Sequence, residues 1–239
     1  MKSCKELKRL SRINLMGRYG NLMGALIVVV LLPLLIELPF SSLNSPNANV
    51  SQMAIFIISE VLIQIVSGLL HLGYITIFFG LARKQEVSTK QIYYCFRNRS
   101  DHFIFGYIMI LLSYLVTASP FLIGFICLKD YGNPITILSL IGLALVSVFL
   151  FTLYHLFYGM VPFLLLERNE LKFYQCFRES RKLLRGHRGE IFYLYLSFIG
   201  LTVLEILSIG IGAIYVEPYR NMTFVNYYIM LTESGNSAS

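Results

Sequence analysis

Charged residues are scarce in this sequence. Of its 239 residues only 14% are Asp, Glu, Lys or Arg, whereas 56% are hydrophobic; a soluble domain carries about 25% charged residues. A chain of this length cannot bury so much apolar surface inside a water-soluble globule. The composition therefore excludes a disordered chain, a nucleic-acid-binding protein and a disulfide-stapled secreted fold as descriptions of the whole chain. It predicts an integral membrane protein.

Residues that carry catalysis or bind metals are also few. The sequence has two aspartates, Asp101 and Asp130, both expected in loops, which excludes an intramembrane protease with paired aspartates. The four histidines are scattered and the four cysteines form no C-x-x-C pair. None of the motifs G-x-x-x-x-G-K-[ST], H-E-x-x-H or G-x-S-x-G occurs. We therefore expect no enzymatic activity, no metal site and no cofactor.

The basic residues are concentrated along the chain. Eighteen of the 20 lysines and arginines lie in three clusters, within residues 2–18, 83–99 and 168–188. The intervals between the clusters, 64 and 68 residues long, each accommodate two membrane crossings of about 20 apolar residues and a short loop. Two crossings return the chain to the side that it left, so all three clusters share one face. The positive-inside rule makes this face, and with it the N-terminus, cytoplasmic.

Hydropathy predicts an all-α, polytopic membrane helix bundle of about six transmembrane helices in a single domain, residues 1–239. The predicted spans are residues 20–40, 53–81, 102–127, 135–166, 190–207 and 213–231. We expect a kink at Pro162 in the fourth span and a break at 208–212, which reads S-I-G-I-G. The sixth span contains Glu217 and Arg220, so it either crosses the membrane or lies along its outer surface. Crossing is favoured and places the C-terminus in the cytoplasm.

A sequence motif recurs along the chain. The pattern R-x-S-R-x-x-L-x-G-x-x-G starts at Arg9 and again, 169 residues later, at Arg178. A second pattern, Y-x-C-F-R, occurs at residues 93–97 and 174–178. Each site leads from a basic segment into a hydrophobic span. This internal repeat predicts three tandem two-span units, about 1–85, 86–168 and 169–239, each beginning with a basic amphipathic helix on the cytoplasmic face.

The third basic segment has the clearest amphipathic pattern. Arg178, Arg181, Arg185 and Arg188 are spaced by three, four and three residues, which predicts one stripe on a helix. Such a stripe can hold guanidinium groups among the anionic headgroups of the lipid bilayer. We interpret it as a topology signal on a surface helix. The alternative is a docking surface for an acidic partner, such as another membrane protein, or for a regulatory lipid.

Polar residues inside the predicted second span share a helix face. Glu60, Gln64 and His71 recur at helical spacing, and such a seam is expected to face other helices because exposure to lipid is costly. Counting the rise per residue from the cytoplasmic ends places Glu60 in the outer half of the bilayer.

The last two predicted spans carry further charges that the same count places near that level: Glu205, Glu217 and Arg220. We expect Arg220 to neutralise one or more carboxylates in a buried cluster. The cluster either bonds helices together or forms a proton- or ion-responsive site or a polar pocket open to the outside.

Three stretches of the sequence resemble a known family. They are K-E-L-K-R-L-S-R at residues 5–12, F-R-E-S-R-K-L-L-R-G-H-R at 177–188, and L-S-F-I-G at 196–200 followed by L-S-I-G-I-G at 207–212 and P-Y at 218–219. Together they resemble the bacterial integral membrane proteins grouped as domain-of-unknown-function family 975. The resemblance covers nearly the whole chain. It implies a bacterial cytoplasmic membrane protein of about six helices, with no catalytic residues and no established substrate.

Two classes of function fit these features. The first is a non-catalytic accessory or interaction component of a membrane transport, envelope-stress or immunity system, which the short outer loops and basic cytoplasmic helices favour. The second is a transporter or channel for ions or small amphiphiles, which the repeated unit and the polar seams favour. An intramembrane enzyme is disfavoured by the missing catalytic motifs, and no nucleic-acid partner is expected.

Overall fold

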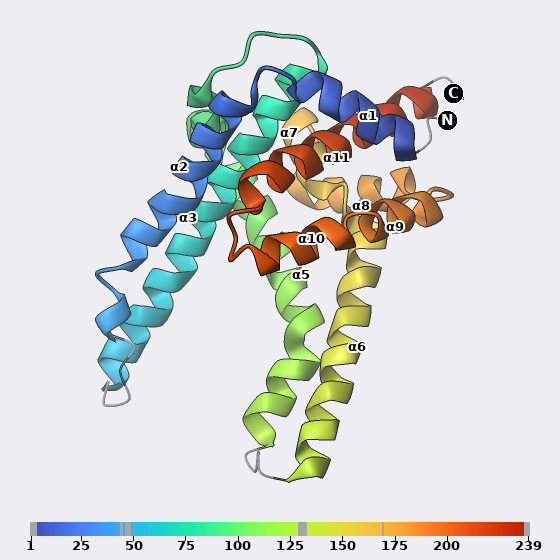
Figure 1. The fold of residues 1–239 in the computed structure, drawn as a ribbon. Helices are drawn as coiled ribbons and strands as arrows, with labels where there is room; N and C mark the ends of the chain where they lie inside the picture. The colour runs from blue at the N-terminus through green and yellow to red at the C-terminus, as the bar shows by residue number, and fades with distance from the viewer. Residues whose placement is uncertain (1–3, 44, 46–48, 129–132, 169, 237–239) are drawn as a thin grey trace. The chain divides into compact units, whose positions relative to one another are not determined.

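The computed structural model describes residues 4–43, 45, 49–128, 133–168 and 170–236, with side chains to residue 233 (Figure 1). This part of the chain is almost entirely helical and forms no strand, so the all-α prediction is confirmed. Asp130, with most of the loop expected between the predicted spans 102–127 and 135–166, lies outside the described residues. The helices are α1 (Cys4–Leu15), α2 (Tyr19–Glu37), α3 (Val50–Ala82), α4 (Tyr94–Arg97), α5 (Ser100–Cys127), α6 (Pro134–Tyr158), α7 (Val161–Glu167), α8 (Phe173–Leu183), α9 (Arg188–Leu196), α10 (Ile199–Leu207) and α11 (Ala213–Asn236), with short 3-10 helices η1 (Ser41–Leu43) and η2 (Thr89–Tyr93).

Five helical stretches among the described residues are long and apolar enough to cross a membrane. They are Tyr19–Glu37, Val50–Ala82, Ser100–Cys127, Pro134–Glu167 and Arg188–Leu207. Many of their large apolar side chains are exposed, and exposed apolar surface of this extent requires a lipid environment. The chain is therefore a membrane protein. The predicted sixth span forms α11, which is not among these five.

Both expected interruptions of the spans are present. The fourth span is divided at Gly159–Met160 into α6 and α7, since Pro162 in the first turn of α7 has no N–H to continue the helix. The segment 208–212 forms a turn between α10 and α11, with positive φ at Ile209 (53°) and Gly210 (83°).

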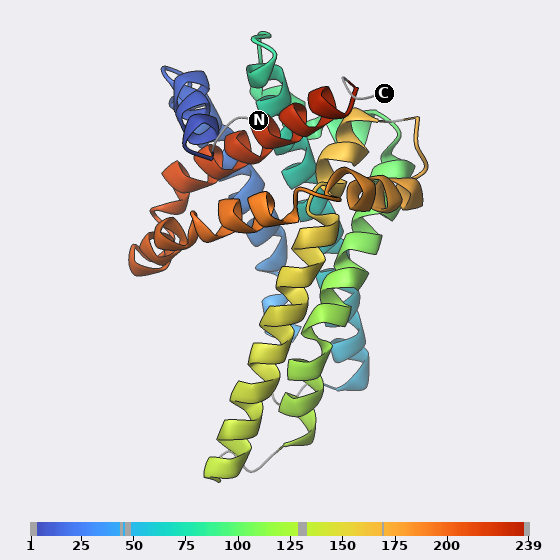
Figure 2. The ribbon, with the colours of Figure 1, turned by 90° about the vertical axis from the view of Figure 1, so that its right-hand side faces the viewer.

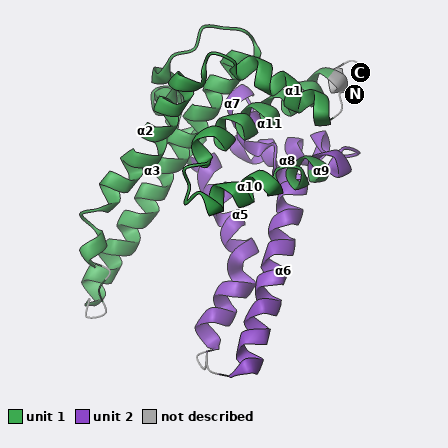
Figure 3. Cartoon of the chain, viewed as in Figure 1, with its two compact units in different colours: residues 1–104, 192–239 green, residues 105–191 purple. Residues whose placement is uncertain are grey.

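The chain divides into two compact units (Figure 3). Unit 1 comprises residues 1–104 and 192–239, and unit 2 comprises residues 105–191. In unit 1, α2 and α3 form a long antiparallel pair (Figure 1). The segment after α3 folds back onto it through η2. Gly73 makes this possible, because a Cβ there would lie 1.8 Å from the carbonyl oxygen of Ile92.

Three further helices of unit 1, namely α1, α10 and α11, run across the α2–α3 pair. Figure 2 shows α10 and α11 crossing the direction of α2, and α1 lies along α11. The contact between α1 and α11 is specific: Asn226 donates a hydrogen bond to the fully buried Ser11 hydroxyl (3.0 Å). Phe79 of α3 packs edge-on against Tyr228 of α11.

Unit 2 contains most of α5, then α6, α7 and α8. Aromatic side chains join its elements: Tyr114 of α5 packs against Tyr154 of α6, and Tyr158 of α6 packs against Phe177 of α8. The buried Ser180 hydroxyl donates to the carbonyl oxygen of Phe157 (3.2 Å), which docks α8 on the end of α6.

Candidate functional site

The turn at 208–212 folds α10 and α11 into a hairpin and brings their charged residues together. The turn is closed by the Gly210 N–H, which donates to the carbonyl oxygen of Glu205 (2.9 Å), and by the Gly212 N–H, which donates to the Ser208 hydroxyl (2.8 Å). Glu205 near the end of α10 thereby faces the first turns of α11, where Glu217 and Arg220 lie one turn apart.

Arg220 bridges two carboxylates in this hairpin. Its Nη2 lies 3.2 Å from Oε1 of Glu205 and also forms an ion pair with Glu217. Asn221 donates from Nδ2 to Oε2 of Glu217 (3.3 Å), and Nη1 of Arg220 lies 3.5 Å from the Thr202 hydroxyl. The Glu205 side chain is only 12% exposed. One guanidinium thus holds two carboxylates, and we call Arg220, Glu205 and Glu217 the Arg220 cluster.

The other three predicted members of the polar cluster lie on α3. His71 lies within electrostatic range of Glu217 and Arg220, so it is the nearest of the three to the Arg220 cluster. Glu60 is eleven residues from His71, about 16 Å along the helix, and Gln64 is exposed between them. One carboxylate oxygen of Glu60 is buried and has no hydrogen-bond partner among the described residues.

The sequence predicts that Glu60 and the Arg220 cluster lie at a similar depth in the bilayer. In the structure Glu60 lies away from the cluster along α3. The α10–α11 hairpin lies across α2 and α3, so rise along the hairpin does not measure depth in the bilayer. Tyr215 near the start of α11 packs against Tyr19, the first residue of α2. This contact places the start of α11 near the N-terminal end of the first span.

The predicted arginine stripe is wrong as a single helical feature. Only Arg178 and Arg181 lie on α8, which ends at Leu183. Gly186 has a φ of 92°, a left-handed conformation that ends a helix, so Arg185 lies in the turn and Arg188 begins α9. The spacing of the arginines continues past the end of α8, and Gly186 is the stop signal that the sequence contains there.

We call the four arginines of this segment, Arg178, Arg181, Arg185 and Arg188, the arginine surface. The guanidinium groups of Arg181 and Arg188 lie over the ring of Phe157, at 5.7 and 4.1 Å from its centroid. Arg178 and Arg185 are exposed. The nearby carboxylate of Glu179 is paired with Lys182. Glu179 therefore does not compensate the positive charge of the arginines.

Thiol and metal chemistry find little support. Burial raises the pKa of the Cys95 thiol to about 12 and that of the Cys176 thiol to about 11, which keeps both protonated at neutral pH. Among the described residues, no group of three or more His, Cys, Asp or Glu side chains could hold a metal ion.

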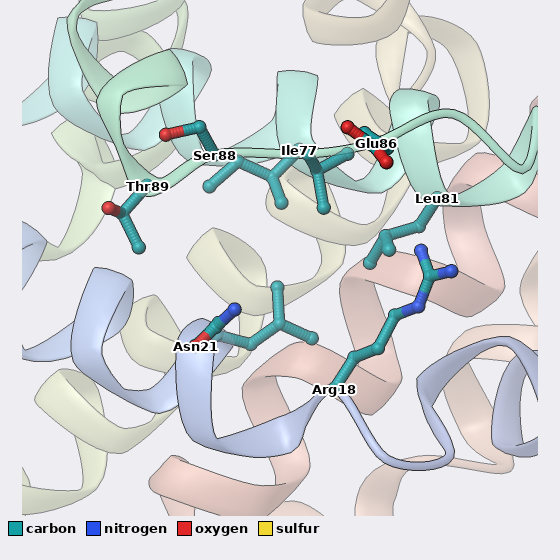
Figure 4. Close-up of a pocket in the computed structure, with 9 residues that line it drawn as sticks. Arg18, Asn21, Ile77, Leu81, Glu86, Ser88 and Thr89 are labelled. Atoms are coloured by element: carbon teal, nitrogen blue, oxygen red, sulfur yellow. The ribbon is translucent and has the colours of Figure 1, made fainter.

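The sequence did not predict a cavity of about 300 Å³ in unit 1 (Figure 4). Arg18 and Asn21 from the start of α2 line one side, and Glu86, Ser88 and Thr89 from the segment after α3 line the other. Leu22, Ile77, Leu81 and Val87 complete the lining. The signal in the sequence was slight: Arg18 borders a span, and Glu86 is an acidic residue inside a basic cluster.

Comparison with known proteins places the chain in a family. The family model described as "Protein of unknown function (DUF975)" matches residues 1–235, which confirms the resemblance found in the sequence. No curated protein and no solved structure matches the chain. With nearly its whole length covered by that model, the chain belongs to the DUF975 family of proteins of unknown function.

Proposed function

We propose that this protein is a non-catalytic component of the bacterial cytoplasmic membrane whose arginine surface binds anionic groups, either lipid headgroups or an acidic membrane partner. The observation that carries the proposal is a contrast in charge pairing. The carboxylates of the α10–α11 hairpin are paired with Arg220, whereas Arg178 and Arg185 are exposed. Each exposed cation near an anionic leaflet contributes about 1 kcal/mol of attraction.

Contacts within unit 1 support a topology with both ends of the chain in the cytoplasm. The basic helix α1 is on the cytoplasmic side by the positive-inside rule, and α11 lies along it. The C-terminal part of α11 is therefore on the same side. Because the hairpin crosses α2 and the start of α11, just after the turn, lies beside Tyr19, we propose that α10 and α11 form a re-entrant hairpin in the cytoplasmic half of the bilayer.

Labelling of an engineered thiol separates this topology from six full crossings. Ser208 lies in the turn of the hairpin, so Ser208→Cys, with Cys127 replaced by Ser, should resist an impermeant maleimide added to whole cells. Ser51→Cys, in the exposed start of α3, is the positive control. Labelling of position 208 from outside would support two complete crossings and contradict the re-entrant hairpin.

Matching positions support the three-unit repeat. The helix α2 begins at Tyr19, and α9 begins 169 residues later, at Arg188. Gly17 and Gly186, also 169 residues apart, have φ values of 73° and 92°. In the middle unit Arg99 has a positive φ just before α5, where the glycine pair of the motif is missing.

The docking of the basic segments follows one rule in all three units. The α1 helix packs on α11, η2 and α4 pack on α3, and α8 packs on α6 and α7. The basic segments of the second and third repeats thus each dock on the second helix of the preceding repeat. The basic segment of the first repeat docks on the second helix of the last repeat. This pattern supports three copies of one structural element, with each basic segment connecting one repeat to another.

Lipid selectivity tests the role of the arginine surface. In nanodiscs of phosphatidylcholine with increasing phosphatidylglycerol, the thermal stability of the wild type should rise, and added salt should weaken the rise. The double variant Arg178→Gln/Arg185→Gln should lose most of it, while Lys5→Gln/Arg9→Gln, which removes two charges from α1, should retain it. An equal response of both variants would contradict a specific arginine surface. Purification in mild detergent then tests for a membrane partner.

One observation favours the second candidate function, a transporter or channel. The buried oxygen of Glu60 has no hydrogen-bond partner among the described residues, and intramembrane carboxylates of this kind mark proton or cation pathways. Proton and cation flux into proteoliposomes, compared between wild type and Glu60→Gln, tests it. Flux that depends on Glu60 would favour transport, and absence of flux under every gradient would contradict it.

A further inference from the structure

The cavity in unit 1 carries both signs of charge (Figure 4). Arg18 supplies a guanidinium from one wall and Glu86 a carboxylate from the other, and the Arg18 side chain points toward the segment that holds Glu86. Neither forms an ion pair with another described residue. The cavity therefore offers an anion site and a cation site that are not occupied by one another.

This arrangement selects for a ligand that carries both charges. A purely anionic ligand would bind Arg18 but meet repulsion from Glu86, and a cationic ligand would have the opposite difficulty. Ser88 and Thr89 add hydroxyl groups to the same wall as Glu86. The Ser88 oxygen accepts a hydrogen bond from the Lys90 N–H, which leaves its proton free to be donated to a ligand oxygen.

The place of the cavity in the chain indicates the source of such a ligand. Arg18 directly precedes the span Tyr19–Glu37, and Glu86 follows the end of α3 at Ala82 by four residues. Both charges therefore lie at the same interface of the membrane, at the level of the lipid headgroups. The floor of the cavity is apolar and includes Leu22 and Leu81, which suits the boundary between headgroup and acyl chains. Its volume of about 300 Å³ is at the small end of ligand sites.

We propose that this cavity binds the phosphoethanolamine group of a membrane phospholipid. The phosphate accepts hydrogen bonds from the Arg18 guanidinium and from the Ser88 or Thr89 hydroxyl. The primary ammonium donates to the Glu86 carboxylate. A choline headgroup has no N–H to donate to Glu86, and a glycerol headgroup has no cation, so both bind more weakly.

Competition between lipids in nanodiscs tests the site. The full-length protein is placed in phosphatidylcholine discs containing equal amounts of phosphatidylethanolamine and phosphatidylglycerol, and the lipid retained after extraction is identified by native mass spectrometry. The wild type should retain phosphatidylethanolamine over phosphatidylglycerol by about tenfold, the effect of one charge-assisted hydrogen bond. Glu86→Gln should abolish this preference, and Arg18→Gln should reduce retention of both lipids.

Matched controls separate this site from general surface charge. Arg9→Gln and Glu6→Gln make the same changes at exposed positions of α1 that do not line the cavity, and they should behave as the wild type. An unchanged preference in Glu86→Gln, or an equal loss in Glu6→Gln, would overturn the proposal. If Arg18→Gln does not fold, the comparison of Glu86→Gln with Glu6→Gln decides alone.

A second arm identifies the source of the phosphoethanolamine group. Soluble glycerophosphoethanolamine is added to the detergent-solubilised protein at the concentration at which the phospholipid saturates the site. Failure to displace the lipid supports a membrane headgroup, and full displacement would overturn the lipid assignment in favour of a soluble phosphoethanolamine compound. The outcome is independent of the arginine surface, whose test follows phosphatidylglycerol and leaves Arg18 and Glu86 intact.

Discussion

The twelve-residue motif occurs in two segments, α1 with its following turn and α8 with its following turn. Both segments dock a basic helix, but on different supports. Each buries its motif serine completely and turns at a glycine with positive φ. Each also holds an arginine over an aromatic ring, Arg12 over Tyr219 and Arg181 over Phe157. They differ in what lies beneath them.

The difference lies in the distance along the chain. Ser180 donates to the carbonyl of Phe157, 23 residues earlier, whereas Ser11 accepts from the side chain of Asn226, 215 residues later. The support of α8 is the apolar helix α6, and the support of α1 is α11, which carries Arg220 and Glu217 of the Arg220 cluster. The motif therefore specifies docking of a basic helix. Whether that docking depends on the charges of the Arg220 cluster is determined by the helix on which the basic helix packs.

The largest difference between the segments should come from Arg220→Ala. The substitution leaves Glu205 and Glu217 close together without a cation, at a cost of about 3 kcal/mol in the free energy of unfolding. Denaturant unfolding in detergent measures it. Cysteine accessibility at position 11 should rise while that at position 180 is unchanged. The triple variant with Glu205→Gln and Glu217→Gln should recover much of the stability; normal stability of Arg220→Ala itself would refute the buried pairing.

Substitution of the motif glycines should affect both segments equally. Gly17→Ala and Gly186→Ala each force an L side chain into a left-handed conformation, at about 1–2 kcal/mol. Thermal unfolding of the two variants measures the cost. Gly189→Ala, at a glycine with open space around it and no positive φ, is the control and should be close to neutral. A neutral Gly17→Ala would mean that the turn after α1 is not required.

The motif serines should differ in a smaller way. Ser11→Ala removes the acceptor of the Asn226 amide and leaves that amide half-buried without its partner, at about 1–2 kcal/mol. Ser180→Ala removes only a donor to a carbonyl oxygen, at about 1 kcal/mol or less. Unfolding in detergent compares them, and Ser119→Ala on an exposed face of α5 serves as reference. A larger loss at Ser180 would reverse the assigned roles of the two supports.

The smallest effect should come from the arginines over the rings. Arg12→Gln and Arg181→Gln each remove an exposed cation–π contact worth about 0.5 kcal/mol. Arg12→Lys and Arg181→Lys keep the charge and should lose less. Thermal unfolding at low and high salt distinguishes ring stacking, which persists in salt, from attraction to distant charges, which does not.

The sequence was informative wherever a single physical cause determines the result. Long apolar runs require lipid whatever their tertiary context, so five of the predicted spans appear as apolar helices. Pro162 lacks a donor in every environment, and the break between α6 and α7 follows from that. Charge pairing within the C-terminal helices could be anticipated because an isolated Arg220 in a largely apolar segment is costly.

Other features depend on three-dimensional arrangement and could not be read from periodicity. The direction of the α10–α11 hairpin is set by its packing on α1, α2 and α3, so residue counting misplaced Glu60 relative to Arg220. The arginine stripe failed at Gly186, where backbone conformation overrode the spacing. The segment after α3, which lines the cavity, folds back where Gly73 admits the backbone of Ile92, a contact with no periodic signature.

The bond between Ser11 and Asn226 has a consequence for biosynthesis. A ribosome makes α1 more than two hundred residues before the helix on which it will rest. Throughout that interval α1 lacks the helix on which it mainly packs, and the headgroup layer of the membrane can hold an amphipathic basic helix. Completion of unit 1 is therefore a late event of synthesis, because its first helix packs on its last.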